Sequence, residues 1–138
     1  MKIVICGSMG ASAQMLSAKI ELEKAGHEIV IPRNTEAYAR GELGFESDHE
    51  SASNKIKHDL IRVYFDKIKN SDAILVINTE KKGIENYIGG NTFLEMAFAH
   101  VLHKKIYLLN DIPEFGYQDE VIAMQPIIIN GDLQRINL

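Results

Sequence analysis

The chain has 138 residues, 46% of them hydrophobic and 25% charged, which is typical of one globular domain spanning 1–138. Its formal net charge of −4 excludes general nucleic-acid binding, because no surplus of basic residues is available to neutralise phosphates. No apolar run reaches the roughly 18 residues that cross a membrane, and the apolar run after Met1 and Lys2 is too short for a signal peptide.

The first third of the chain predicts two strands with a helix between them. Lys2 to Cys6 is a continuous apolar run rich in β-branched residues, which favours a central strand covered on both faces. The segment after it has helical spacing and ends at Gly26, with an apolar side formed by Met15, Ala18, Ile20 and Leu22. His27 to Pro32 then predicts a second strand.

The middle of the chain contains a polar excursion and an amphipathic helix. Arg33 to Asn54 is polar and acidic, and it predicts a long loop or a partly helical segment. Loops of this length in a compact domain are often binding lids or disordered segments. Lys55 to Asn70 has the spacing of an amphipathic helix.

The remainder predicts three more strands, at 72–78, 104–110 and 126–130. A helix from Thr92 to Leu102 and a short helix near Asp119 to Met124 separate them, and a final turn follows at 131–136. Strands that alternate with helices predict a parallel sheet with right-handed crossovers. We therefore expect an α/β fold, a single doubly wound sheet of five parallel strands in the order 2-1-3-4-5.

Such a sheet binds its ligands beyond the carboxyl ends of its strands, in the crevice between strands one and three. Three loops are expected to meet there, at 7–12, 78–91 and 110–118. The candidate site is therefore sought in these loops and at the start of the helix after strand three.

A carboxylate stands inside the most apolar helix of the chain. Nearly every residue from Thr92 to Leu102 is apolar, which predicts a buried helix, yet Glu95 lies within it. An unpaired carboxylate is costly to bury. One explanation is a capping box, in which Thr92 and Glu95 satisfy each other's backbone N–H groups. The other is a catalytic carboxylate at the mouth of the crevice, where burial and the helix end pull its pKa in opposite directions.

The first loop, GSMGAS, is built from small residues that let backbone N–H groups approach an anion or a sugar hydroxyl. Gly7, Ser8 and Gly10 are its candidate ligand contacts. The alternative is a tight strand–helix turn in which Ser8 or Ser12 caps the helix. The loop matches neither the dinucleotide-binding nor the P-loop pattern.

Three other polar or reactive features admit simpler interpretations. Asp72, at the start of strand three, is a candidate substrate contact, although an Asp at a strand edge is usually a turn or cap residue. His100 and His103 lie at a spacing that could chelate a metal, but no matching Cys, Asp or Glu accompanies them, and we expect no metal. Cys6 is expected to be an inert buried thiol. As the single cysteine it can form no internal disulfide, which indicates a reducing, cytoplasmic environment.

Three segments together resemble the nucleoside 2-deoxyribosyltransferase family, which includes the deoxynucleoside monophosphate N-glycosidases. They are CGSM at 6–9, SDAILVIN at 71–78 and TFLEMAFAHVLHKKIYLLN at 92–110. Leu94 to Ala99 is similar to the family's F-E-L-G-x-A pattern, which implies that Glu95 is the nucleophile. The resemblance also implies a flavodoxin-like or Rossmann-like fold, a small-molecule nucleoside or nucleotide substrate, and no cofactor.

This chain departs from the family pattern at several positions. Tyr64 stands where the family commonly has an Asp that assists the nucleophile, and Gly10 and Ile122 replace an arginine and a serine of the phosphate-reading members. Asn91 replaces a glycine, with Gly90 displaced one step outward. Tyr64 is therefore the candidate assistant to Glu95, while Gly90 and Asn91 are candidate sugar contacts.

The leading hypothesis is an N-glycosidase or deoxyribosyltransferase that acts through Glu95. A non-catalytic nucleotide- or nucleoside-binding module is the first alternative. A phosphoribohydrolase of the lysine-decarboxylase-like type is the second, because GGNTFLE at 89–95 is similar to part of its motif. A homodimer or higher homo-oligomer is expected, since 119–130 is similar to a family dimer-interface segment and the apolar residues nearby favour association: Phe115, Tyr117, Val121 and Met124.

Overall fold

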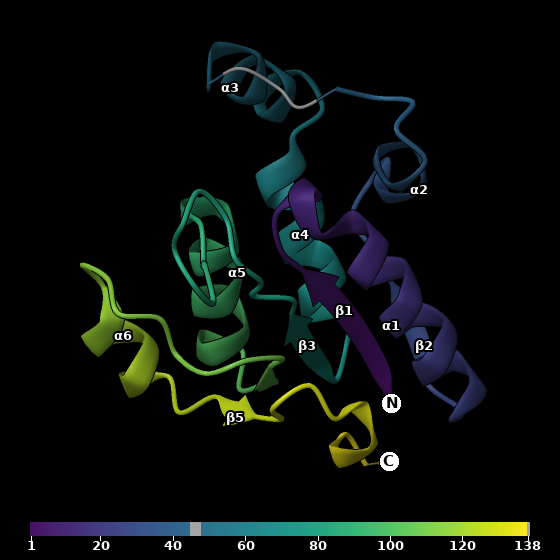
Figure 1. The fold of residues 1–138 in the computed structure, drawn as a ribbon, viewed down its shortest axis with the longest axis vertical. Coiled ribbons are helices and arrows are strands. Elements are labelled where there is room, and N and C mark those ends of the chain that lie inside the picture. Colours follow the sequence, from purple (N-terminus) through teal and green to yellow (C-terminus); the bar gives the residue numbers. More distant parts are fainter. Residues whose placement is uncertain (45–47, 138) are drawn as a thin grey trace.

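The computed structural model describes residues 1–44 and 48–137 (Figure 1). Five parallel strands form one sheet in the order β2-β1-β3-β4-β5. They are β1 (Lys2–Cys6), β2 (Glu28–Val30), β3 (Ala73–Val76), β4 (Lys105–Leu108) and β5 (Ile127–Ile128). The predicted fold class and strand order are confirmed.

Helices cover both faces of this sheet, as its alternating side chains require. On one face Ile3, Ile5 and Leu75 pack against α1 (Ser12–Lys24) and the segment around the 3₁₀ turn η2 (Leu133–Arg135). On the other face the core joins the sheet to α4 (Leu60–Lys69), α5 (Gly90–Val101) and α6 (Gln118–Ala123). None of the helices in these described ranges is long and apolar enough to cross a membrane.

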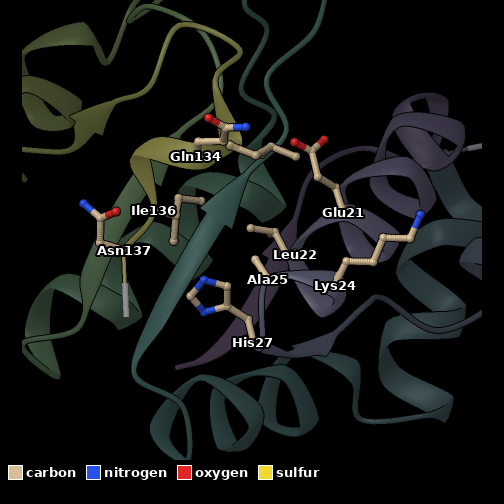
Figure 2. A pocket seen from close by; sticks show the side chains of 9 residues that line it. Glu21, Leu22, Lys24, Ala25, His27, Gln134, Ile136 and Asn137 are labelled. Carbon is tan, nitrogen blue, oxygen red and sulfur yellow. The ribbon is translucent and has the colours of Figure 1, made fainter.

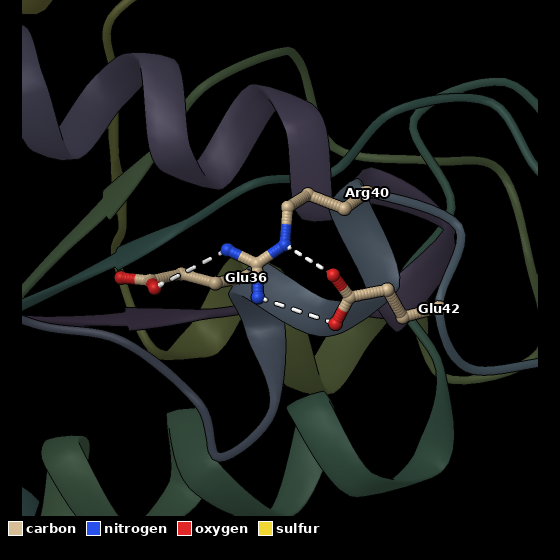
Figure 3. Close-up of polar contacts among 3 residues, drawn as sticks. All are labelled: Glu36, Arg40 and Glu42. Carbon is tan, nitrogen blue, oxygen red and sulfur yellow. Dashed lines mark hydrogen bonds and ion pairs between the residues drawn. The ribbon is translucent and has the colours of Figure 1, made fainter.

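The excursion between β2 and α4 is partly helical, the second of the two alternatives that its composition left open. It contains α2 (Thr35–Ala39) and α3 (Asp48–Lys57), and residues 45–47 lie outside the described ranges. The Arg40 guanidinium closes the end of α2, with its Nε 2.8 Å from Glu42 Oε1 and a second nitrogen 3.8 Å from Glu36 (Figure 3). Hydrogen bonding to Arg40 lowers the pKa of Glu42. All three side chains are solvent-exposed, so this cluster orders the turn without adding much stability.

The prediction of one helix over 55–70 was wrong, because two helices occupy this segment. Asp59 has a left-handed backbone conformation, with φ 49°, which ends the hydrogen-bonding pattern of α3 and lets α4 begin at Leu60. Aspartate tolerates this region better than most residues. Periodicity alone cannot detect such a break, because the apolar spacing continues through it.

A buried asparagine ties together the loops at the carboxyl ends of β3 and β4. The Asn78 side chain is fully buried, donates to the carbonyls of Asn110 and Asp111, and accepts from the Asn110 backbone N–H. The Asn110 side chain in turn donates to the Asn78 carbonyl at 2.9 Å. These bonds hold two of the predicted site loops in fixed positions at one edge of the sheet.

Candidate active site

Helix α5 begins earlier than predicted, and this changes the interpretation of Glu95. The helix starts at Gly90 with Gly89 as its N-cap, so Thr92 lies within its first turn and Glu95 within its second. A capping box needs Thr92 at the N-cap position. That explanation of Glu95 is therefore wrong, and its burial needs another one.

Glu95 lies on the inner side of α5, facing α4 and the end of β1. It is only 5% exposed and makes no hydrogen bond to another described residue. Every fully buried side-chain nitrogen or oxygen within the described ranges has a hydrogen-bond partner. The carboxylate oxygens of Glu95 are therefore not completely sealed from solvent.

Burial raises the pKa of Glu95 to about 8, and the nearby ammonium of Lys55 partly opposes this shift. The side chain is consequently neutral for the most part at pH 7 in the free protein. Lys55, which lies on α3, was not among the residues that the sequence indicated. Its position near Glu95 depends on how α3 packs against α4, which local sequence does not reveal.

Tyr64 lies near enough to Glu95 for the carboxylate to raise the pKa of the Tyr64 hydroxyl, so these two predicted catalytic residues belong to one region. The Tyr64 hydroxyl donates to the Ile5 carbonyl in β1. Burial first, and then the neighbouring Cys6 and Glu95, raise its pKa. Because its proton is directed to Ile5, the hydroxyl can offer only lone pairs to a third group.

Cys6 is the last residue of β1 and forms part of the same cluster. It is fully buried, as predicted, and burial followed by the charge of Glu95 raises its thiol pKa. A thiol held in its neutral form is a poor nucleophile. Cys6 therefore serves as an apolar neighbour of Glu95.

A small hollow of about 50 Å³ lies between the loops that follow β1 and β3. Ser8 and Gly10 line it from the first loop, and Thr79, Lys81 and Tyr87 line it from the second. The Lys81 ammonium lies 5.4 Å from the centre of the Tyr87 ring, a cation–π arrangement that orients the charge. This position agrees with the crevice expected between strands one and three.

In the first loop, close packing requires a glycine at position 7, and Ser8 and Gly10 border the hollow. A Cβ atom on Gly7, whose φ is +155°, would lie 2.8 Å from Met15 Cε and 3.0 Å from the Ile77 carbonyl oxygen. Ser8 caps a 3₁₀ turn, η1 (Met9–Ala11), by accepting from the Gly10 N–H at 3.2 Å. Ser8 thus caps the turn before α1 and not the expected helix itself, whose N-cap is Ala11, and the side chain also borders the hollow.

Asp72 is separated from the other predicted site residues. It precedes β3, at the amino edge of the sheet, and its carboxylate accepts from the Lys2 N–H at 2.8 Å. Ligands of a doubly wound sheet bind at the opposite edge. The expectation that Asp72 contacts substrate is therefore corrected, and the simpler interpretation as a strand-edge residue stands.

Gly90 and Asn91 are exposed at the start of α5, on the carboxyl side of the sheet, but neither lines the small hollow. His100 and His103 are also exposed, at the far end of the same helix. Within the described ranges no group of three or more His, Cys, Asp or Glu residues could hold a metal ion.

No family model and no curated protein sequence matches this chain. Among solved structures, the chain is similar to the CMP N-glycosidase BcmB of Clostridium botulinum. The TM-score is 0.54 at 17% sequence identity, and the alignment covers 98% of this chain and 97% of that one. This similarity shows a common fold over the whole length of both chains.

Proposed function

We propose that this chain cleaves the N-glycosidic bond of a nucleoside or nucleotide, as a glycosidase or a deoxyribosyltransferase, with Glu95 as the nucleophile. The observation that carries the proposal is the buried Glu95 carboxylate beside Tyr64, without a hydrogen bond among the described residues and with a pKa near 8. Burying a carboxylate costs desolvation free energy, so a carboxylate with a purely structural role would be expected to have a hydrogen-bond or ion-pair partner.

Cleavage of an N-glycosidic bond suits a carboxylate that is shielded from bulk water. One Glu95 oxygen forms a bond to C1′ of the sugar while the C1′–N bond breaks, and the released electron pair and a proton go to the departing base. Water then adds at C1′, regenerates the carboxylate and releases the sugar; in a transferase a second base takes the place of water. The carboxylate offsets the positive charge that develops at C1′, so it is needed in its ionised form.

The surrounding residues supply positioning in this proposal. Tyr64 directs hydroxyl lone pairs beside the nucleophile, where a sugar hydroxyl can donate to them. Gly90 and Asn91 offer backbone N–H groups and an amide at the start of α5 for the other sugar hydroxyls. Gly7, Ser8 and Gly10 contact the 5′ end of the substrate.

Lys81 is the cation that a 5′-phosphate would meet in the small hollow. The family's first-loop arginine is absent at Gly10, but Lys81 places a positive charge beside Ser8 and Thr79 in the same crevice. An ammonium and two hydroxyl groups suit a phosphate, while the Glu80 carboxylate, which also lines the hollow, accepts a hydrogen bond from the Gly83 N–H. The name of the BcmB enzyme, a CMP N-glycosidase, adds support for a nucleotide substrate.

The test is a panel of nucleosides and 5′-monophosphates, incubated with and without a free acceptor base and followed by chromatography. We expect at least one substrate to release its base, and Glu95→Gln to lower that rate by at least 10³-fold without lowering the melting temperature. Glu114→Gln, an exposed carboxylate in the 110–118 loop, is the control and keeps full activity. Absence of base release from the whole panel would contradict the proposal.

A non-catalytic binding module is the second candidate, and one observation favours it. Glu95 does not line the small hollow that Ser8 and Lys81 share, so the carboxylate and the crevice are distinct in the free protein. This candidate predicts saturable nucleotide binding without turnover. Calorimetry beside the chromatographic assay separates the two candidates, because only an enzyme consumes its ligand.

A further inference from the structure

A second hollow of the described structure lies away from the proposed active site. Its volume is about 490 Å³, within the range of small-molecule sites. The carboxyl-terminal end of α1 forms one wall and the segment 133–137 forms the other, with His27 between them (Figure 2). His27 immediately precedes β2, so this hollow is at the amino edge of the sheet, opposite Glu95.

His27 directs one hydrogen-bond donor toward this space. The residue is only 5% exposed, and its Nδ1 lies 3.1 Å from the Met1 nitrogen. Because the Met1 nitrogen can only donate, Nδ1 accepts, and the proton of a neutral ring is on Nε2. Nε2 has no partner within the described ranges, while every fully buried side-chain nitrogen there has one, so Nε2–H reaches the hollow.

The residues that line the hollow indicate which kind of ligand could accept a hydrogen bond from His27 Nε2–H. Leu22 and Ile136 line the space from opposite elements but are almost fully buried, at 1% and 4% exposed, whereas Ala25 is exposed at its rim (Figure 2). The rim carries one acidic and one basic side chain, Glu21 and Lys24, so it has no net charge. The amide of Gln134 can both donate and accept.

We propose that this hollow is a second small-molecule site, which binds a neutral planar heterocycle carrying a carbonyl or ring-nitrogen acceptor. The ring lies in the mouth of the hollow against Ala25, its acceptor receives the His27 Nε2–H, and its polar edge pairs with Gln134. A free nucleobase and a benzamide-like ring share this chemistry. The site is independent of the proposed glycosidase reaction, because none of its residues belongs to the Glu95 cluster.

The experiment uses the full ¹⁵N-labelled chain and NMR titration with uracil, adenine and benzamide. Benzoate and benzylamine serve as charged counterparts of benzamide. We expect saturable shifts at Ala25, His27 and residues 133–137 and at the His27 ring nitrogens, with the charged rings binding at least tenfold more weakly. Absence of saturable shifts with every neutral probe, or equal binding of the charged rings, would overturn the proposal.

Four variants test the location of the site and its independence of Glu95. Ala25→Trp places a large ring on the rim and should weaken binding at least tenfold, whereas Ala13→Trp, at an exposed position near the other end of α1, should leave it unchanged. His27→Phe keeps a planar ring without the donor and should weaken binding at least threefold. Unchanged binding in Ala25→Trp would place the ligand elsewhere. Glu95→Gln should bind the probes like the parent chain, so this result does not depend on catalysis.

Discussion

Glu95 links the stability of the protein to the chemistry proposed for it. Its pKa of about 8 in the folded chain lies well above the value of an unfolded glutamate. Between these two values the folded chain holds a proton that the unfolded chain has lost, so stability falls as pH rises through this window. Burial of the carboxylate is therefore a cost that grows from about pH 4.5 to about pH 8.

Replacing Glu95 by Gln should stabilise the protein at alkaline pH. The amide has nearly the same shape and cannot ionise, so it avoids the cost of a buried charge. At pH 8 we expect an increase of a few kcal/mol in the free energy of unfolding, of the order that the pKa shift implies. The difference should shrink toward zero near pH 4.5. Urea denaturation at several pH values measures it, and a difference independent of pH would contradict the assigned pKa.

The rate of the proposed reaction should rise with pH. The nucleophile must be ionised, and kcat/KM reports the ionisation of the free enzyme. We therefore expect kcat/KM to increase tenfold per pH unit below about pH 8 and to level off above it. Lys55→Met removes the nearby ammonium that opposes this shift, and it should move the midpoint to higher pH. A midpoint near pH 4.5 would show that substrate meets an exposed carboxylate.

Single residues differ in how far the sequence could predict their roles. Glu95 was detectable because a carboxylate in an apolar helix contradicts its surroundings. Lys55 and Lys81 were not, because a lysine in a polar segment has the same appearance whether it is solvated or faces a site. Asp72 was correctly placed at the start of strand three, but its assignment as a substrate contact was wrong, because the starts of parallel strands lie at the edge of the sheet opposite the crevice.

Among the elements, the strands were easier to predict than the helix boundaries. Buried β-branched runs identified all five strands, and β1 was predicted with its observed bounds. The break at Asp59 and the start of α5 at Gly90 depend on backbone conformations that leave the apolar pattern unchanged. The capping-box error followed directly, because a shift of two residues moved Thr92 from the predicted cap into the helix.

The Asn78 junction between β3 and β4 should be essential to the loops around the site. Asn78→Ala removes three part-buried hydrogen bonds, to the Asn110 N–H and to the carbonyls of Asn110 and Asp111. We expect a loss of about 2–4 kcal/mol in unfolding free energy, since buried unsatisfied groups each cost about 1–3 kcal/mol. Asn70→Ala, at an exposed position, is the control and should change little. Chemical denaturation gives both values, and equal effects would contradict the role of the junction.

At the scale of the whole molecule, the sheet separates two candidate sites. The proposed active site lies at the carboxyl edge, where loops after β1 and β3 meet, and the hollow beside His27 lies at the amino edge. The strand order predicted the small hollow between these loops. The second depends on how the segment after β5 returns to the end of α1, a long-range contact that no local pattern encodes.

The expected homodimer stays a prediction, but the structure changes the surface that would form it. Val121 is fully buried, and Phe115, Tyr117 and Met124 pack against the core, so this segment uses its apolar side chains within the chain. The outer side of α5 instead leaves Leu94 44% and Val101 73% exposed. Unpaired apolar side chains on one helix favour association with a second copy.

Val101→Glu should therefore abolish association that the parent chain shows. A charge at the centre of an apolar contact leaves it desolvated and unpaired, so we expect the dimer to dissociate at least 100-fold more readily. Ile20→Glu is the matched control, because Ile20 is 57% exposed on α1, which covers the opposite face of the sheet. Analytical ultracentrifugation over a range of concentrations measures all three proteins. A parent chain that stays monomeric throughout, or an equal effect of Ile20→Glu, would show that the α5 surface does not mediate a dimer.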